Sequence, residues 1–314
     1  PERGGGLRVV SLLPSATEII CGIGLRDSLV GVTHECDFPP DVVGLPVVTA
    51  SRIPKGLASD EIDTLVSDQL ETDSALYSLN EPVLRGLAPD LIVTQALCDV
   101  CAVSAGEVNE MACQLPGDVR VVNLEPTCLQ DVLDTVLLVG AAAGCTAAAA
   151  TYHAELCRRV NQVAARTAAA VPALRPRVAI LEWLDPIYDG GHWYPELIEL
   201  AGGTPCFGEQ QRPSRRRSWG ELMAVAPDVV VVSLCGFDLE RTALDIPLLT
   251  GRSGYGMLPA TVSDQIYMVD GNSYFSRPGP RLVDSLEILA NLLHPEIHPL
   301  PQGMMGAVKI PNTP

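Results

Sequence analysis

Short apolar runs recur along the chain and alternate with longer amphipathic stretches. Residues 8–12 (Arg-Val-Val-Ser-Leu) and 177–181 (Arg-Val-Ala-Ile-Leu) have the pattern of strands, and a Val-rich run follows Asp228. Continuous apolar runs of this length are typical of strands that are buried on both faces of a parallel sheet. Because helical stretches separate the runs, the pattern predicts right-handed βαβ units and an α/β fold.

A weak internal repeat divides the chain. Ala88-Pro89-Asp90 and Ala226-Pro227-Asp228 each follow a short amphipathic stretch, and each introduces an apolar run that leads to a cysteine. The repeat predicts two Rossmann-like lobes with mostly parallel sheets, an N-terminal α/β lobe over residues 7–140 and a C-terminal α/β lobe over residues 174–298.

The segment between the lobes, residues 141–173, is predicted to be a linking helix. It is rich in Ala and Arg, and residues 146–170 contain neither proline nor glycine. At 1.5 Å per residue, one helix over residues 146–170 would be about 37 Å long. A single long helix therefore joins the two lobes in this interpretation. The tail over residues 299–314 is rich in Pro and Gly, and we expect it to be loosely ordered.

Composition narrows the class of protein. The chain has 314 residues, 47% of them hydrophobic, and a net charge of −17. It can bury a large core, and its acidity argues against nucleic acid as a partner. Its apolar runs are too short for a membrane span. No export signal is recognisable at the N-terminus, so the compartment stays open: periplasmic if a signal was removed, otherwise cytoplasmic or organellar.

Chemically distinctive side chains gather after the predicted strands, where ligands bind in open parallel sheets. Aromatic side chains there suit a large flat ligand, His192 follows two glycines, and Arg277 suits an anionic group. The candidate ligand-binding residues are Ser15, Glu182, Trp183, His192, Trp193, Phe237, Tyr274, Phe275 and Arg277.

A second set of residues suits a metal. His34 and Cys36 follow one predicted strand, Cys98 and Cys101 have a chelating spacing, and Cys235 follows the Val-rich run. Thiolate and imidazole are ligands of zinc, iron and cobalt. The same cysteines are also compatible with inert thiols or with a redox pair. Common catalytic motifs such as Walker A and H-E-x-x-H are missing from the sequence, and we predict no catalytic residue.

Six motifs together resemble a known family: Ser11-Leu-Leu-Pro-Ser-Ala-Thr-Glu18, His34-Glu-Cys-Asp-x-Pro39, Cys98-x-Val-Cys-Ala102, Gly191-His-Trp-x-Pro-Glu196, Cys235-Gly-Phe-Asp238 and Arg277-Pro-Gly-Pro-Arg281. Over about residues 8–295 the chain resembles the cobalamin-binding-protein subgroup of ABC-transporter solute-binding proteins. This subgroup has the class III periplasmic-binding-protein fold of the helical-backbone metal receptor, or TroA-like, superfamily.

The resemblance implies a function. It implies a non-catalytic protein that holds a corrinoid (cobalamin-like) or related metal chelate in an interlobe cleft, with an ABC permease as its partner. Two alternatives stay open. One is an intracellular protein with a zinc or iron site of Cys and His ligands in the same cleft, an enzyme or a chaperone, in which Glu182 and His192 are candidate ligands or acid–base groups. The other is a structural subunit that retains the fold.

Overall fold

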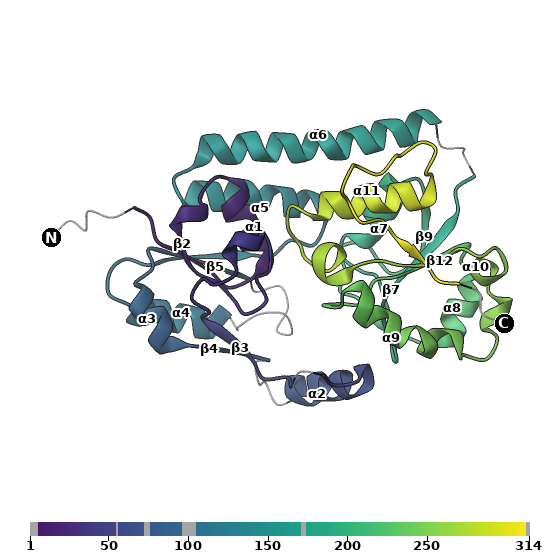
Figure 1. Ribbon diagram of the computed structural model, residues 1–314, viewed down its shortest axis with the longest axis horizontal. Coiled ribbons are helices and arrows are strands. Elements are labelled where there is room, and N and C mark those ends of the chain that lie inside the picture. Colours follow the sequence, from purple (N-terminus) through teal and green to yellow (C-terminus); the bar gives the residue numbers. More distant parts are fainter. Residues whose placement is uncertain (1–5, 55, 72–75, 96–104, 171–173, 312–314) are drawn as a thin grey trace. The chain divides into compact units, whose positions relative to one another are not determined.

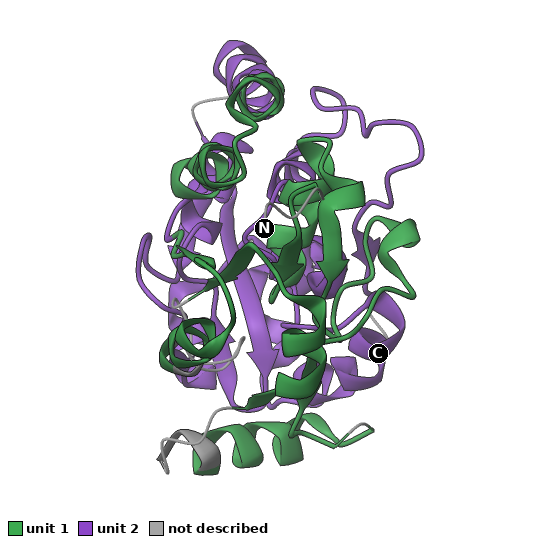
Figure 2. Ribbon diagram, turned by 90° about the vertical axis from the view of Figure 1, so that its left-hand side faces the viewer, with its two compact units in different colours: residues 1–126, 130–155 green, residues 127–129, 156–314 purple. Residues whose placement is uncertain are grey.

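The structure is a computed structural model, and it describes residues 6–54, 56–71, 76–95, 105–170 and 174–311. The chain forms two compact units, shown in different colours in Figure 2. Unit 1 comprises residues 1–126 and 130–155, and unit 2 comprises residues 127–129 and 156–314. The main boundary lies inside helix α6 (Thr146–Ala170), so the chain passes from unit 1 to unit 2 within regular helix.

Unit 1 is built on a parallel sheet with helices. Its strands are β1 (Val9–Ser11), β2 (Leu29–Gly31), β3 (Thr49–Ser51), β4 (Tyr77–Leu79), β5 (Leu91–Gln95) and β6 (Arg120–Leu124). Its helices are α1 (Pro14–Gly22), α2 (Ser59–Glu71), α3 (Glu81–Leu87), α4 (Ala105–Gln114) and α5 (Leu129–Ala142). The sheet has the order β2-β1-β5-β6 with every pair parallel, and β3 and β4 form a separate antiparallel pair.

The sheet of unit 1 is buried on both faces. Val10 and Ile92 lie in one core cluster with Leu84 of α3 and Met111 of α4. Their neighbours along the strands, such as Val9, point to the opposite face and are also buried. Because successive side chains of a strand alternate between faces, apolar residues are needed at every position. The predicted α/β class and the predicted two-sided burial are therefore confirmed.

Unit 2 contains the larger sheet. Its strands are β7 (Arg177–Leu184), β8 (Ile187–Asp189), β9 (Thr204–Phe207), β10 (Arg216–Arg217), β11 (Val229–Val232), β12 (Ile266–Met268) and β13 (Val308–Lys309). The order is β10-β8-β7-β11-β12-β13, and β9 also pairs with β7. Strands β9, β7, β11 and β12 pair in parallel, whereas β8, β10 and β13 pair antiparallel at the two sides.

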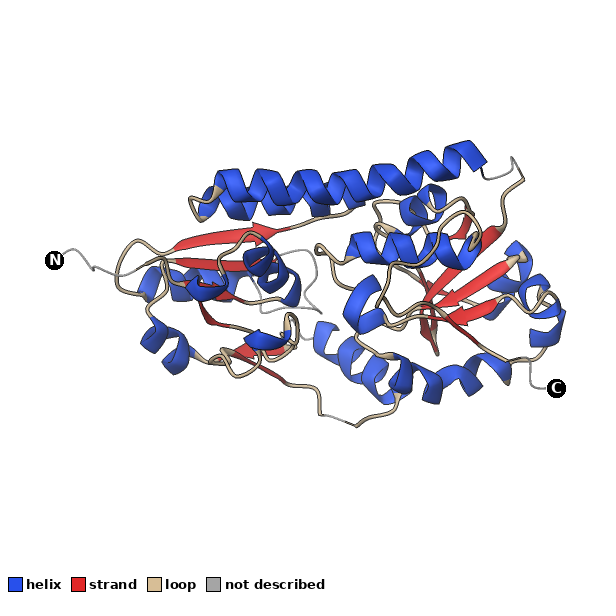
Figure 3. Cartoon of the chain, turned by 45° about the horizontal axis from the view of Figure 1, so that its top comes forward, coloured by secondary structure: helices blue, strands red, loops and turns tan. Residues whose placement is uncertain are grey.

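Helices cover both faces of this second sheet (Figures 1 and 3). They are α7 (Tyr194–Leu200), α8 (Trp219–Val225), α9 (Leu239–Thr250), α10 (Pro259–Val262), the π-helix η4 (Gly271–Phe275) and α11 (Leu282–Leu293). Val230 shares a core cluster with Leu222 of α8 and Leu249 of α9. On the other face, Gly203 lies so close to Val178, Ile198 of α7 and Leu293 of α11 that a Cβ there would meet all three side chains. The sheet is thus the middle layer of three.

The repeated Ala-Pro-Asp turns are built alike in the two units. In unit 1, the Asp90 carboxylate accepts a hydrogen bond from the Arg8 backbone N–H at 2.9 Å. In unit 2, the Asp228 carboxylate accepts from the Arg177 backbone N–H at 2.8 Å. The alanine two residues before each aspartate has a left-handed φ, 43° in one turn and 45° in the other. The sequence repeat therefore marks equivalent positions of two Rossmann-like lobes.

Helix α6 has the bounds that the sequence predicts, and each half is fixed to a different unit. In its first half, the Ala149 side chain packs directly over Gly140 of α5, where no Cβ could fit. In its second half, Arg159 donates to Glu287 of α11 at 2.7 Å and to Asp284 at 2.5 Å. None of the helices within the described ranges has the length and hydropathy of a membrane span.

The described part of the tail, residues 299–311, contains a short strand that its composition does not predict. Strand β13 pairs antiparallel with β12, and the Ile310 N–H donates to the Ile266 carbonyl at 2.9 Å. Ile310 belongs to the core cluster of unit 2 and is only 4% exposed. Proline and glycine disfavour helix in this segment, but burial of one isoleucine and the pairing to an open sheet edge fix its end.

Candidate functional site

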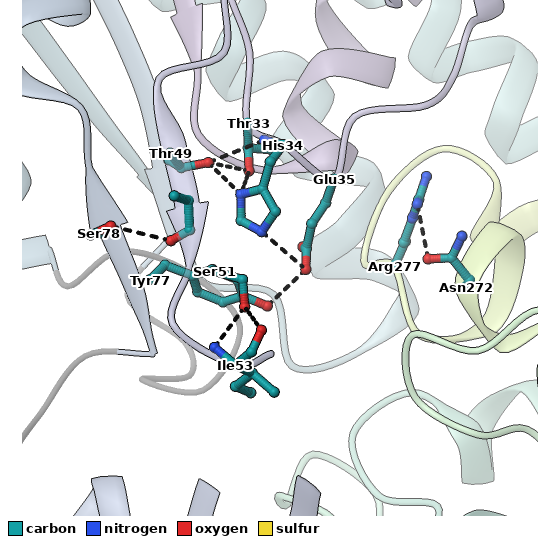
Figure 4. A network of polar contacts seen from close by, with 11 residues as sticks. Thr33, His34, Glu35, Thr49, Ser51, Ile53, Tyr77, Ser78, Asn272 and Arg277 are labelled. Atoms are coloured by element: carbon teal, nitrogen blue, oxygen red, sulfur yellow. Dashed lines mark hydrogen bonds and ion pairs between the residues drawn. The ribbon is translucent and has the colours of Figure 1, made fainter. Parts of the chain in front are cut away.

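In unit 1, a network of polar contacts surrounds His34, which follows β2 (Figure 4). Its Nδ1 lies 2.7 Å from the Thr49 hydroxyl at the start of β3, and its backbone N–H donates to the same oxygen at 3.1 Å. Thr33 and Thr49 join their hydroxyls at 2.7 Å. The imidazole is therefore fixed through Nδ1, the arrangement that orients a histidine whose Nε2 is used for binding.

The other edge of the His34 ring faces Glu35 and Tyr77. The Tyr77 hydroxyl, from β4, donates to Glu35 Oε1 at 2.8 Å, and His34 Nε2 lies 3.9 Å from the same oxygen. The centroids of the His34 and Tyr77 rings are 5.1 Å apart. An imidazole, a phenol and a carboxylate thus stand together at one end of unit 1. The antiparallel pair β3–β4 supplies Thr49 and Tyr77, and neither residue was identified from the sequence.

Ser15 and Cys36 take separate positions in unit 1. Ser15 is buried in the first turn of α1, which has no side-chain cap. The Cys36 sulfur lies 3.0 Å from the Thr17 hydroxyl, which donates to Ser11 at 2.8 Å. Cys36 is thus hydrogen bonded to α1, whereas His34 is hydrogen bonded to β3. The two side chains of the predicted pair have different neighbours.

The predicted metal ligands do not form a cluster in the described part of the chain. Across those ranges, no group of three or more His, Cys, Asp or Glu side chains has the geometry to hold a metal ion. Cys98 and Cys101 lie outside the described residues. Cys235 belongs to unit 2, where it follows β11 and is exposed.

In unit 2, an aromatic pair marks the carboxyl ends of β7 and β11. Trp183, near the end of β7, and Phe237, in the loop after β11, have ring centroids 5.1 Å apart at an angle of 50°. The Arg241 guanidinium lies 4.2 Å from the Phe237 ring centroid and is held by Asp245 at 2.8 Å. Trp183, Phe237 and Arg241, which we call the aromatic stack, are each partly exposed.

Glu182 and Cys235 flank the stack. The Cys235 N–H donates to the Glu182 carbonyl at 3.2 Å, beyond the register shift that interrupts the β7–β8 pairing after Leu181. Beneath them lies Tyr194, which is fully buried. Burial raises the pKa of Tyr194 well above its usual value, and the negative charge of Glu182 adds to the effect. The phenol is therefore a neutral member of the core below the stack.

His192 occupies a tight turn before α7. Its φ is +47°, and its N–H donates to the Arg212 carbonyl at 2.6 Å. Gly191 precedes it because a Cβ there would lie 2.3 Å from the same carbonyl oxygen. The His192 ring stacks on Trp193 with centroids 5.4 Å apart. Burial lowers the pKa of His192, so the imidazole is neutral at neutral pH.

Trp193 and Phe275 lie in the core of unit 2. The Trp193 indole N–H donates to the Phe275 carbonyl at 3.1 Å, and Phe275 stacks on Tyr194 at 6.4 Å. Both side chains are buried, so they anchor the end of η4 in the core of unit 2. Around η4, Tyr274 is half-buried under Arg281 at 5.5 Å, whereas Arg277 is buried and donates to Asn272 at 3.1 Å.

The family model described as "Periplasmic binding protein" matches residues 9–272 of the chain. The chain belongs to the periplasmic binding protein family. This match spans the carboxyl ends of the strands in both units. Proteins of this family bind solutes and work with ABC permeases, so these ends are where such a protein would hold its solute.

Two curated relatives cover most of the chain. The "Vitamin B12-binding protein" of Vibrio cholerae is 22% identical over 91% of this chain and 88% of its own length. The "Cobalamin-binding protein" of Halobacterium salinarum is 27% identical over 91% of this chain and 69% of its own length.

Two solved structures have the same fold. The periplasmic vitamin B12 binding protein of Vibrio cholerae has a TM-score of 0.65 and 20% identity, covering 91% of this chain and 96% of that one. The periplasmic haem-binding protein BhuT, solved with two haems, has a TM-score of 0.70 and 20% identity, covering 93% of this chain and 100% of that one. At such identities the likeness concerns the fold, which is the class III fold that the motifs imply.

Proposed function

We propose that this family member binds a corrinoid, cobalamin or a close analogue, and delivers it without chemical change. The observation that carries the proposal is the pair of relatives, one bacterial and one archaeal, whose names both state cobalamin and which both cover 91% of the chain. Related planar metal chelates such as haem are the competing ligands, since a haem-binding protein shares the fold.

The side chains at the strand ends support a large flat ligand. In unit 2, the aromatic stack offers ring faces to an apolar ring system, and Tyr274 of η4, under Arg281, offers a further ring. In unit 1, His34 is held through Nδ1, and its Nε2 is the nitrogen that would face a metal at the centre of a chelate. We propose that Trp183, Phe237 and Tyr274 are the ligand-contacting residues of unit 2, and that His34 is the candidate residue of unit 1. The remaining predicted residues position them or lie at the edge of the site: Ser15, Cys36, Glu182, His192, Trp193, Cys235, Phe275 and Arg277.

The partner in this proposal is an ABC permease, which places the protein on the outer side of the membrane. Helices α3 and α8 both lead into the repeated turns, so they run antiparallel to the strands that follow and begin at the carboxyl edges of the sheets. Each carries an exposed glutamate in its first turn, Glu81 and Glu221. Carboxylates in the first turns of corresponding helices of the two units suit a pair of permease arginines.

Titration with cyanocobalamin tests the function. We expect one corrinoid per chain by calorimetry, and at least about tenfold weaker binding for Phe237→Ala, because the variant loses the central ring of the aromatic stack. Leu244→Ala is the control, since Leu244 is exposed on α9. A flat titration with folded protein would overturn the proposal, and haemin binding in place of cyanocobalamin would move it to haem.

A further inference from the structure

The three tryptophans differ in how their indole N–H groups are hydrogen bonded. Trp193 Nε1 donates to the Phe275 carbonyl at 3.1 Å, and Trp219 Nε1 donates to the Ser253 carbonyl at 2.8 Å. Trp183 Nε1 is buried and has no hydrogen-bond partner among the residues that the structure describes. Tryptophans in protein interiors normally satisfy this donor. The exception is the tryptophan of the aromatic stack.

A buried N–H group without an acceptor lowers the stability of the folded protein. Burying an N–H without an acceptor costs on the order of 1–3 kcal/mol, because the group loses its hydrogen bond to water. A phenylalanine would fill the same aromatic position beside Phe237 without this cost. The indole therefore weakens the ligand-free protein at the place where the ligand is proposed to bind. This is the pattern expected when a ligand supplies the missing acceptor.

We propose that Trp183 donates its indole N–H to a carbonyl-type oxygen on the rim of the bound chelate. The inference rests on the proposed function and deepens it, because it selects among flat metal chelates. A corrin ring carries carboxamide side chains around its rim, and each offers a carbonyl oxygen. Haem carries carboxylates at one edge only. The nitrogen is buried whereas the side chain is partly exposed, so the ring has to turn when the acceptor arrives.

The proposal assigns opposite effects to one substitution. Trp183→Phe keeps an aromatic ring against Phe237 and removes the N–H. We expect the ligand-free variant to melt at the same temperature as the unmodified protein or higher, because the unsatisfied donor is gone. We expect it to bind cyanocobalamin about three- to tenfold more weakly, the value of one hydrogen bond. A residue with only a packing role would lower both quantities.

Trp219→Phe is the matched control. It removes an indole N–H that is already bonded to a backbone carbonyl, so it should lower the melting temperature and leave the affinity for cyanocobalamin unchanged. Dicyanocobinamide, which keeps the rim amides and lacks the nucleotide, locates the acceptor. An equal loss of affinity for both corrinoids upon Trp183→Phe supports a rim oxygen. A loss confined to cyanocobalamin places the acceptor on the nucleotide and overturns the proposal.

The two proposals fail in different ways. If Trp183→Phe binds cyanocobalamin as tightly as the unmodified protein, the donor role of Trp183 is wrong and the corrinoid function stands. If neither protein binds a corrinoid, the proposed function is wrong. In that case haemin is titrated against the same two proteins, and equal affinities for haemin would overturn the donor role as well.

Discussion

Single hydroxyl groups decide how the candidate residues of unit 1 are held. Thr49 is 5% exposed, and its oxygen serves both the backbone N–H and the ring Nδ1 of His34. It also bonds the Thr33 hydroxyl. One side-chain oxygen thus satisfies several buried polar groups. Its removal would cost each of these groups one hydrogen bond while changing the shape of the core very little.

Thr49→Val should therefore destabilise the protein by about 1–3 kcal/mol, because valine has the same shape and cannot hydrogen bond. Denaturation with urea at neutral pH measures the change. Thr64→Val is the control, since Thr64 is exposed on α2 and bonds only the Asp60 carbonyl of its own helix. Equal stabilities of the Thr49 variant and the unmodified protein would show that the network does not hold His34.

At the scale of elements, the end of helix α6 is fixed by a buried histidine. The Thr167 hydroxyl donates to the Leu200 carbonyl at 2.8 Å, so its oxygen accepts from His298 Nε2 at 3.1 Å. His298 Nδ1 is buried and has no hydrogen-bond partner among the described residues. Burial lowers the pKa of His298, and the neighbouring His294 and Arg166 lower it further. The folded protein therefore holds this imidazole in its neutral form.

Stability should depend on pH through His298. In the unfolded chain a histidine takes up its proton near pH 6.5, whereas the folded chain does so only at lower pH. The contribution is fully present above about pH 6.5 and is lost as the pH falls toward the folded pKa. His298→Gln should remove this part of the slope. The difference in unfolding free energy between the two proteins, measured from pH 7.5 to 5, checks it; a constant difference would contradict it.

At the scale of the whole molecule, the negative net charge and two defined glutamates bear on how a basic partner would dock. The chain carries a net charge of −17, and Glu81 and Glu221 lie in the first turns of the two helices that lead into the repeated Asp turns. Glu221 forms a capping box with Ser218, and Glu81 lies 3.7 Å from Arg85. Both are about half exposed as side chains. The net charge of the whole surface attracts a basic partner at long range, whereas charges at defined positions such as these fix the orientation in which the partner docks.

The double substitution Glu81→Gln and Glu221→Gln tests these positions. Glutamine keeps the capping geometry of α8 and removes both charges. We expect corrinoid uptake by cells that carry the cognate permease to fall at least about fivefold, with the affinity for the corrinoid unchanged. Glu296→Gln, exposed elsewhere in unit 2, is the control. Unchanged uptake would exclude the two glutamates as docking residues.

Much of the fold could be predicted because its signals are local. The Val-rich run, the repeated Asp turns and the proline-free segment over residues 146–170 each carry their own period or punctuation. The β3–β4 pair could not be predicted, because its strands have only three residues each and helix α2 separates them in the sequence. Thr49 and Tyr77 were missed with it. The β-branched run Val47-Val48-Thr49 was the available signal.

The candidate site was less predictable than the fold. The sequence places Trp183, Trp193, Phe237 and Phe275 equally near strand ends, but only packing separates the partly exposed pair from the buried pair. Arg241 could have been found, since it follows the N-cap residue Asp238 by three positions and faces Phe237. The sequence gives no sign that the Trp183 indole N–H has no acceptor among the described residues, because this depends on which atoms the fold places around the indole.

Strand β13 has a consequence for the order in which the protein is made. The ribosome completes β12 about forty residues before it reaches Val308. During that interval, the backbone groups of β12 that pair with β13 have no partner strand. An unpaired edge invites association with other nascent chains. Unit 1 needs nothing from this segment for its own sheet. The sheet of unit 1 can thus form early in translation, whereas the sheet of unit 2 stays incomplete until β13 emerges.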